Sequence, residues 1–209
     1  MKTPFDWTGY DKAGWWGDYQ DDFGRKENTN LEIKQLKEES LKDLIQKGES
    51  QQVEFKPSLV YNFSKKGYSK QVRFIIAKVI CSFLNSKGGK LFVGVNDNGT
   101  LQGLSYDFSL TRPEGKDPRD YFRLEVDRII REYFKSTASD ISGDFEIIDG
   151  VEIFVFTVFP SKFPIFIEGL NGKEFFVRLT TSCEPYTDIE VIVRYCLSHW
   201  SSTQERGGS

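Results

Sequence analysis

The chain has 209 residues, of which 38% are hydrophobic and 28% are charged, and its formal net charge is −3. A chain of this length can bury one good hydrophobic core, so we expect one domain with short extensions. No apolar run approaches the ~20 residues that span a bilayer, and the first residues lack the apolar stretch of a secretory signal. Three cysteines without Cys-x-x-Cys spacing argue against a disulfide framework or a structural zinc site, which favours a cytoplasmic location.

Residues 1–35 are predicted to form an aromatic N-terminal arm. Its aromatic side chains stand among Gly and Asp without helical or strand periodicity: Trp7, Tyr10, Trp15, Trp16, Tyr19 and Phe23. Each large aromatic side chain buries about 150–250 Å² when it is docked, so these side chains are not expected to stay in water. Two alternatives follow. The arm packs on the domain as an irregular segment, or it docks a protein partner or a second copy of the chain.

The segment 36–200 carries the helix and strand signals of one domain. Capping residues and apolar helical spacing predict helices at 38–47, from 69 to the glycine pair at 88–89, at 117–134 and at 187–197. Apolar runs separated by turn signals predict strands at 52–58, 90–96, 145–148, 151–159, 165–168 and 174–179, with 151–159 in a central position. Residues 60–67 are expected to be a polar, basic loop, and 201–209 a polar tail. This order predicts an α+β fold, a two-layer domain of mainly antiparallel sheet with packed helices.

Basic residues are concentrated between positions 56 and 90. This segment contains eight Lys or Arg and no Asp or Glu, so it carries +8 while the rest of the chain carries −11. Such asymmetry can build an anion-attracting face on an acidic protein. The alternative is a solvated loop and the outer face of a helix. The candidate nucleic-acid-binding residues in this segment are Lys65, Lys66, Lys70 and Arg73.

Carboxylates and lysines must carry any catalysis in this chain. Its one histidine, His199, lies at the end of the last predicted helix, where a cation favours the carbonyl terminus. Because side chains alternate along a strand, Glu54 shares a face with Lys56, while the residues between and before them turn toward the core. The alternative is a surface strand with ordinary charges. Asp97 stands at a hairpin, where Asp is also common for turn reasons alone.

Several motifs fall in an order that resembles the AlbA-type domain of the Schlafen family. The chain has a Glu at position 49, then Glu54-Phe55-Lys56, a helix that ends in Asn85-Ser86-Lys87-Gly88-Gly89, and Gly94-Val95-Asn96-Asp97-Asn98-Gly99. Further on, Val158-Phe159-Pro160-Ser161 and Phe176-Val177-Arg178-Leu179-Thr180 resemble two later segments of the family. The resemblance covers roughly residues 41–200. Thr180 stands where the family usually has Gly, which puts a close backbone approach at that turn in doubt.

The resemblance implies a trio of catalytic carboxylates, Glu49, Glu54 and Asp97. Clustered carboxylates bind a hard divalent cation, and the implied cofactor is Mg²⁺ or Mn²⁺. Such a metal polarises a phosphoryl oxygen and activates water. Lys56 would then face the phosphate or stabilise the charged transition state.

The function that the resemblance implies is nucleic-acid processing by a metal-dependent endoribonuclease acting on structured, tRNA-like RNA. The alternative is a non-catalytic DNA- or RNA-binding regulatory module of a larger protein. RNA is the expected ligand in preference to DNA, and no membrane interaction is expected. Arg178 has two alternative roles: it contacts phosphate, or it pairs with a carboxylate at the edge of the core such as Glu54.

Overall fold

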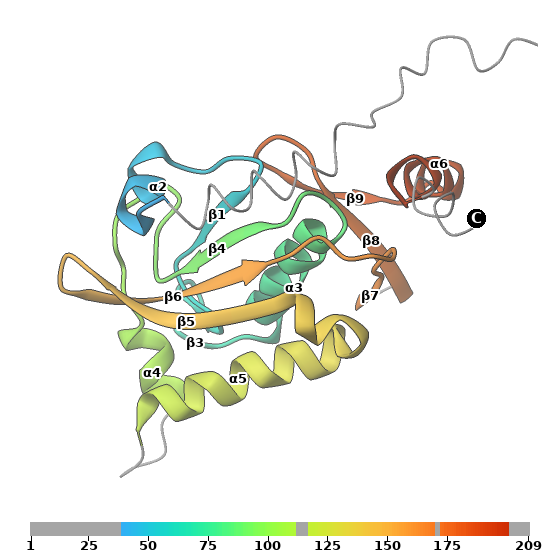
Figure 1. The fold of residues 1–209 in the computed structure, drawn as a ribbon. Coiled ribbons are helices and arrows are strands. Elements are labelled where there is room, and N and C mark those ends of the chain that lie inside the picture. The colour runs from blue at the N-terminus through green and yellow to red at the C-terminus, as the bar shows by residue number, and fades with distance from the viewer. Residues whose placement is uncertain (1–38, 112–116, 170–171, 201–209) are drawn as a thin grey trace, which may run out of the picture.

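The structure is a computed structural model that describes residues 39–111, 117–169 and 172–200 of the chain. It shows an α+β domain of mainly antiparallel sheet with packed helices, as the sequence predicts (Figure 1). The aromatic arm predicted for 1–35 and the polar tail predicted for 201–209 lie outside the described residues.

The central sheet has four strands in the order β1-β4-β6-β5. Its strands are β1 (Val53–Lys56), β4 (Gly89–Val93), β5 (Ile141–Ile148) and β6 (Val151–Val158). The pairs β4–β6 and β5–β6 are antiparallel. Strand β6 therefore lies in the interior of the sheet, as its nearly continuous apolar sequence predicts. The pair β1–β4 is parallel, which requires a long crossover connection between them. That crossover contains α3 (Lys70–Leu84).

Three of the expected helices begin with a side-chain cap. Ser40 caps α2 (Leu41–Lys47), Ser69 caps α3, and Asp117 caps α5 (Pro118–Tyr133), whose first residue is a proline. Helix α3 contacts β4 and β6 of the central sheet and also packs against a second sheet. In Figure 1, α5 runs beside β5, and the rings of Phe122 and Phe145 join the two elements at 5.4 Å.

The second sheet has the order β7-β8-β9 and is antiparallel throughout. It consists of β7 (Ile167–Gly169), β8 (Gly172–Arg178) and β9 (Cys183–Tyr186), and the last of these was not predicted. The final helix, α6, spans Ile189–Trp200. Its cap differs from the expected Thr187, because the Asp188 carboxylate accepts the backbone N–H groups of Glu190 and Val191.

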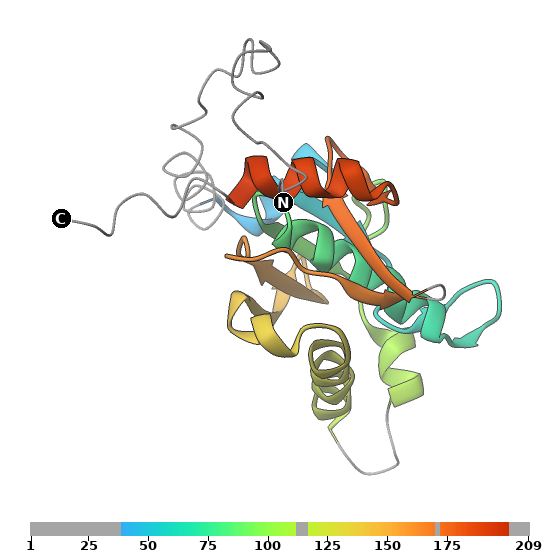
Figure 2. The same cartoon turned by 90° about the vertical axis from the view of Figure 1, so that its right-hand side faces the viewer.

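The segment expected to be a loop at 60–67 forms a β-hairpin instead. Its strands are β2 (Tyr61–Asn62) and β3 (Gly67–Tyr68), and Figure 2 shows it projecting from the body of the domain beside α4 (Ser105–Thr111). Helix α4 and the 3-10 helix η2 (Lys135–Asp140) were also not predicted. Asp107 of α4 anchors the segment that leads into the hairpin, because its carboxylate accepts the backbone N–H groups of Leu59, Val60 and Tyr61 at 2.9–3.2 Å.

Both faces of the central sheet are buried. Leu91 and Val93 belong to a core cluster with α3 and α5, whereas Phe92, which points the other way, belongs to a second cluster with α2. In β1, Val53 and Phe55 face the second cluster, so Glu54 faces the side covered by α3 and the second sheet. Among the described residues, no helix is long and apolar enough to cross a membrane.

Candidate functional site

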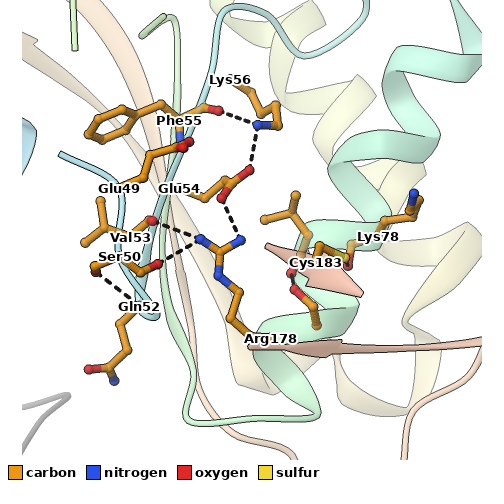
Figure 3. A network of polar contacts seen from close by, with 12 residues as sticks. Glu49, Ser50, Gln52, Val53, Glu54, Phe55, Lys56, Lys78, Arg178 and Cys183 are labelled. Atoms are coloured by element: carbon orange, nitrogen blue, oxygen red, sulfur yellow. Dashed lines mark hydrogen bonds and ion pairs between the residues drawn. The ribbon is translucent and has the colours of Figure 1, made fainter. Parts of the chain in front are cut away.

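Glu54 lies at the centre of a buried polar network (Figure 3). The residue is 7% exposed, and its Oε1 lies 2.6 Å from Nζ of Lys56. Its Oε2 lies 2.6 Å from Nη1 of Arg178, the last residue of β8. The predicted pairing of Glu54 with Lys56 is therefore present, but the strand face that carries it is not a surface. The reason is that the second sheet covers this side of β1 and brings a second cation to the carboxylate.

Arg178 ties the second sheet to the segment before β1. Its side chain has no exposed surface, and Nη2 donates to the carbonyls of Ser50 at 2.8 Å and Val53 at 3.1 Å. The guanidinium also lies over the ring of Phe83, with its Cζ 5.1 Å from the ring centroid. Of the two roles that the sequence left open for Arg178, the structure shows the carboxylate pair. A guanidinium buried in this way is not available to a phosphate in this arrangement.

The other two carboxylates of the predicted trio lie near this network. Glu49 is half-buried, and its Oε1 accepts the backbone N–H of Phe55 at 2.9 Å. Burial raises the pKa of the Glu49 carboxyl, and the negative charges of Glu54 and Asp97 raise it further, while the Phe55 bond and Lys56 oppose the shift. Asp97 is exposed on the turn after β4. The fold therefore brings the three acidic residues into one electrostatic neighbourhood.

The trio does not fit a divalent cation in the arrangement seen here. Both oxygens of Glu54 are held by cations, and one oxygen of Glu49 accepts a backbone N–H. No group of three His, Cys, Asp or Glu side chains within residues 39–111, 117–169 and 172–200 is placed to hold a metal ion. Metal binding by Glu49, Glu54 and Asp97 stays a prediction.

A pocket of about 640 Å³ opens beside this network. It is lined by residues before β1 and after β8: Glu49, Ser50, Gln51, Arg178, Leu179, Thr180 and Thr181. The Glu49 carboxyl is the acidic group of this lining. A ligand bound in this pocket would therefore lie next to Glu49, the residue whose carboxyl has a raised pKa.

The Asn85 motif joins α3 to the second sheet. The buried side chain of Asn85 donates to the carbonyls of Ile165 and Phe176 and accepts the N–H of Ile165, all at 2.8–2.9 Å. The next residue, Ser86, accepts the backbone N–H of Arg178 at 2.9 Å. Both of these motif residues therefore have structural roles that hold β8, and with it Arg178, against α3.

Of the five predicted nucleic-acid-binding residues, which include Arg178, three lie on the surface. Lys65, Lys66 and Lys70 are exposed on the hairpin and at the first residue of α3, and they form no ion pair within the part of the chain that the structure describes. Arg73 differs from the prediction, because it is 9% exposed and its Nη2 lies 2.6 Å from Oε2 of Glu132 on α5. Its place one turn into α3 points it at α5, so it is not part of the exposed basic surface.

The structure also reveals three aromatic rings that were not among the predicted site residues. Tyr61, Phe63 and Tyr106 form one cluster, with centroids 5.0 Å apart for Tyr61–Phe63, 4.8 Å for Tyr61–Tyr106 and 5.2 Å for Phe63–Tyr106. The alternation of Tyr61 and Phe63 next to two lysines is a signal that the sequence contains. Tyr106 carries no such signal, because it joins the cluster only through the packing of α4 beside the hairpin.

Comparison with known proteins places these motifs in a family. The family model described as Schlafen, AlbA_2 matches residues 49–187. Among solved structures, the crystal structure of the DIP2311 protein from Corynebacterium diphtheriae is similar, with 18% sequence identity and a TM-score of 0.49. That match covers 89% of this chain and 34% of that one, so the chain spans about a third of the length of the protein it matches. Because the family match includes Glu49, Glu54, Asp97 and Arg178 and extends over more than half of the 209 residues, the chain belongs to the Schlafen AlbA_2 family, a family of nucleic-acid-related domains.

Proposed function

We propose that this domain binds nucleic acid through the basic surface formed by Lys65, Lys66 and Lys70. The observation that carries the proposal is the exposure of these three side chains, without ion pairs among the described residues, on and beside a projecting hairpin. A lysine that is not neutralised by a neighbouring carboxylate can give its charge to a phosphate and release that phosphate's counterions. The ligand that we propose is RNA, which rests on the family resemblance of the motif residues.

Charge reversal of the three lysines tests this proposal. The variant Lys65→Glu/Lys66→Glu/Lys70→Glu should bind RNA much more weakly than the parent, and its affinity should depend less on salt. For single strands, each lost phosphate contact removes roughly 0.7 units from the slope of log K against log salt, so three contacts remove about 2 units. The measurement is fluorescence anisotropy of a labelled RNA over a series of salt concentrations.

A control variant separates the effect of losing this surface from the effect of changing the net charge of the protein. Three exposed lysines from other elements of the fold are replaced by Glu in the control, so that the total charge changes equally: Lys135, Lys162 and Lys173. The control should keep most of the parent's affinity and slope. If the control loses affinity as much as the hairpin variant does, binding follows the overall charge and the proposed surface is wrong.

A second candidate function is cleavage of RNA beside Glu49. The observation that favours it is that the Glu49 carboxyl, whose pKa is raised, lines the 640 Å³ pocket and lies near Lys56 and Asp97. A carboxyl with a raised pKa is better matched to proton transfer near neutral pH than an ordinary one. Lys56 could offset the negative charge that develops on a phosphate. The involvement of Mg²⁺ or Mn²⁺ is part of this second proposal and rests on the family resemblance alone.

Cleavage is tested with structured RNA in the presence and absence of Mg²⁺ or Mn²⁺. Both Glu49→Gln and Asp97→Asn should abolish cleavage without unfolding the domain, because each amide keeps the size of the acid but loses its charge. Asp149→Asn is the matched control, since Asp149 also lies in a hairpin turn, does not line the pocket, and pairs only with Lys42 among the described residues. Asp97→Asn protein that cleaves as fast as the parent would show that other residues, or a contaminant, carry the activity.

A further inference from the structure

We infer that the ring cluster of Tyr61, Phe63 and Tyr106 is a stacking site for unpaired bases, so that the domain prefers single-stranded RNA to duplex. This inference rests on the proposed nucleic-acid binding and names the part of the ligand that the hairpin recognises. Aromatic side chains in a basic groove are the usual platform for single strands, because every base has a face that can stack.

The exposure of the rings supports this inference. Phe63 is 39% exposed and Tyr106 is 43% exposed, although both are large enough to dominate a small core. The contact between Phe63 and Tyr106 is edge-to-face at an interplanar angle of 72°, and the Tyr61–Phe63 contact is similar at 70°. Rings in such contacts support one another's orientation, so the cluster offers an ordered surface.

Polar contacts hold the backbone around the hairpin independently of the ring cluster. Asp107 already holds the approach to β2 through three backbone N–H groups, and Ser69 donates its backbone N–H to the Val60 carbonyl at 2.8 Å. Ser58 adds a side-chain bond to the Tyr61 carbonyl at 2.6 Å. These polar contacts already fix the backbone of the hairpin. The exposed faces of the rings are therefore available to a ligand.

A pocket next to the cluster has the size and lining for part of a nucleotide. It has a volume of about 250 Å³, which is below the roughly 300–1,000 Å³ of pockets that enclose a whole small molecule. It lies between the hairpin and the outer face of α3, and its lining includes two of the three rings together with apolar residues and one cation: Lys56, Pro57, Tyr61, Phe63, Val72 and Ile75. The lining itself contains no carboxylate, but its one cation, Lys56, is already paired with Glu54 at 2.6 Å, so the phosphates of a bound strand would be met by Lys65 and Lys66.

The charges around the rings indicate single-stranded RNA as the ligand. Lys65 and Lys66 follow Phe63 closely along the hairpin, and both are exposed. The run from 56 to 90 has no Asp or Glu. A single strand offers its bases and its phosphates at the same time, so it can use the rings and the lysines together. In a duplex the base faces are already stacked, and only the lysines remain useful.

The test compares two RNA probes with the full chain. One probe is a labelled oligouridine strand, and the other is a labelled RNA duplex of the same length. Phe63→Ala and Tyr106→Ala should each weaken binding of the single strand by roughly tenfold, and should change duplex binding little. The slope of log K against log salt should stay as in the parent, because neither substitution changes a charge.

Two further variants keep the test decisive. Phe63→Trp retains a ring and should bind the single strand at least as well as the parent, even if Phe63→Ala disturbs the hairpin. Phe163→Ala removes an exposed ring outside the cluster, 69% exposed, and should change nothing.

The outcomes separate this inference from the proposed function. If the parent binds both probes with a steep salt dependence but Phe63→Ala and Tyr106→Ala bind the single strand unchanged, base stacking is wrong and the basic surface stands. Equal weakening of strand and duplex by the two alanine variants also overturns the stacking site. If the parent binds neither probe, the proposed function fails and this inference fails with it.

Discussion

Replacing Arg178 by Met removes the cation at the centre of the buried network and keeps much of its apolar stem. The side chain of Arg178 has no exposed surface, and its guanidinium holds Glu54 at 2.6 Å and the carbonyls of Ser50 and Val53. The variant leaves the Glu54 carboxylate, itself 7% exposed, with Lys56 as its remaining cation. It also leaves two carbonyls without their donor. The network therefore loses its link between β8 and β1 and retains a poorly compensated charge.

The expected cost is large for a domain of this size. Removing one partner of a buried ion pair destabilises a protein by about 3–5 kcal/mol, since the remaining charge stays desolvated. The two carbonyl bonds are part of the same loss, so we expect about 4 kcal/mol for Arg178→Met in total. Single domains have a free energy of unfolding of about 5–15 kcal/mol, so the variant should be close to the limit of folding.

A double-mutant cycle measures the coupling directly. Glu54→Gln alone leaves Arg178 buried without its carboxylate and should also destabilise strongly. Glu54→Gln/Arg178→Met removes both charges and should cost less than the sum of the two single changes, with a coupling energy of about 2–3 kcal/mol. The assay is urea unfolding followed by circular dichroism, with the free energy taken from the midpoint at a common slope.

The matched control is the exposed pair of Lys173 and Glu168 in the same sheet. Their side chains are 65% and 63% exposed at a separation of 2.9 Å, so Lys173→Met should hardly move the midpoint. If the urea midpoints of Arg178→Met and Lys173→Met are the same within experimental error, the argument from burial is refuted. Strict additivity in the cycle would refute the claim that the two charges stabilise each other.

Three further predictions concern pH, packing and the N-terminal arm. Burial raises the pKa of Asp107 to about 6 from its usual 3.8, so the folded state holds this proton more tightly than the unfolded chain does. The stability that protonated Asp107 contributes is present below pH 4 and is lost as the pH rises through about 6. If the free energy of unfolding of the parent and of Asp107→Asn varies in parallel between pH 4 and 7, this prediction is wrong. Gly89→Ala should cost about 1–3 kcal/mol in urea unfolding because the new Cβ would lie 2.6 Å from the Gln52 carbonyl oxygen, whereas Gly67→Ala, which has 3.9 Å of room, is the control. Deleting residues 1–28 should leave the domain folded and change its sedimentation mass or its affinity for a partner, and an unfolded truncated chain would mean that the arm is part of the core.

Local signals allowed much of the secondary structure to be predicted from the sequence. The caps at Ser69 and at Asp117 involve side chains that bond to backbone groups within three residues, so their effect does not depend on the rest of the fold. The turn at Asp149 and Gly150 is local in the same way, because both residues have positive φ. The order of the motifs around Glu49, Glu54 and Asp97 was also readable without a structure, and it indicated the family.

Pairing between distant segments could not be predicted from these signals. The parallel register of β1 with β4 depends on how α3 crosses the sheet, and the short strand β9 exists only because β8 offers it an edge. Helix α4 was missed because its main anchor, the Asp107 carboxylate, bonds to backbone groups 46–48 residues away. Such contacts have no local signature in the sequence.

Whether a charged side chain is buried or exposed was the property hardest to predict from the sequence. By itself, the sequence determined that Glu54 and Lys56 share one face of a strand, since side chains alternate. Only the tertiary structure decided that this face is buried, because the second sheet brings Arg178 onto it from 124 positions further along the chain. For the same reason Lys65, Lys66 and Lys70 remain exposed on the hairpin, while Arg73 is taken up by Glu132 of α5. A charge is known from the sequence, but its partner and its exposure are set by which distant elements pack against it.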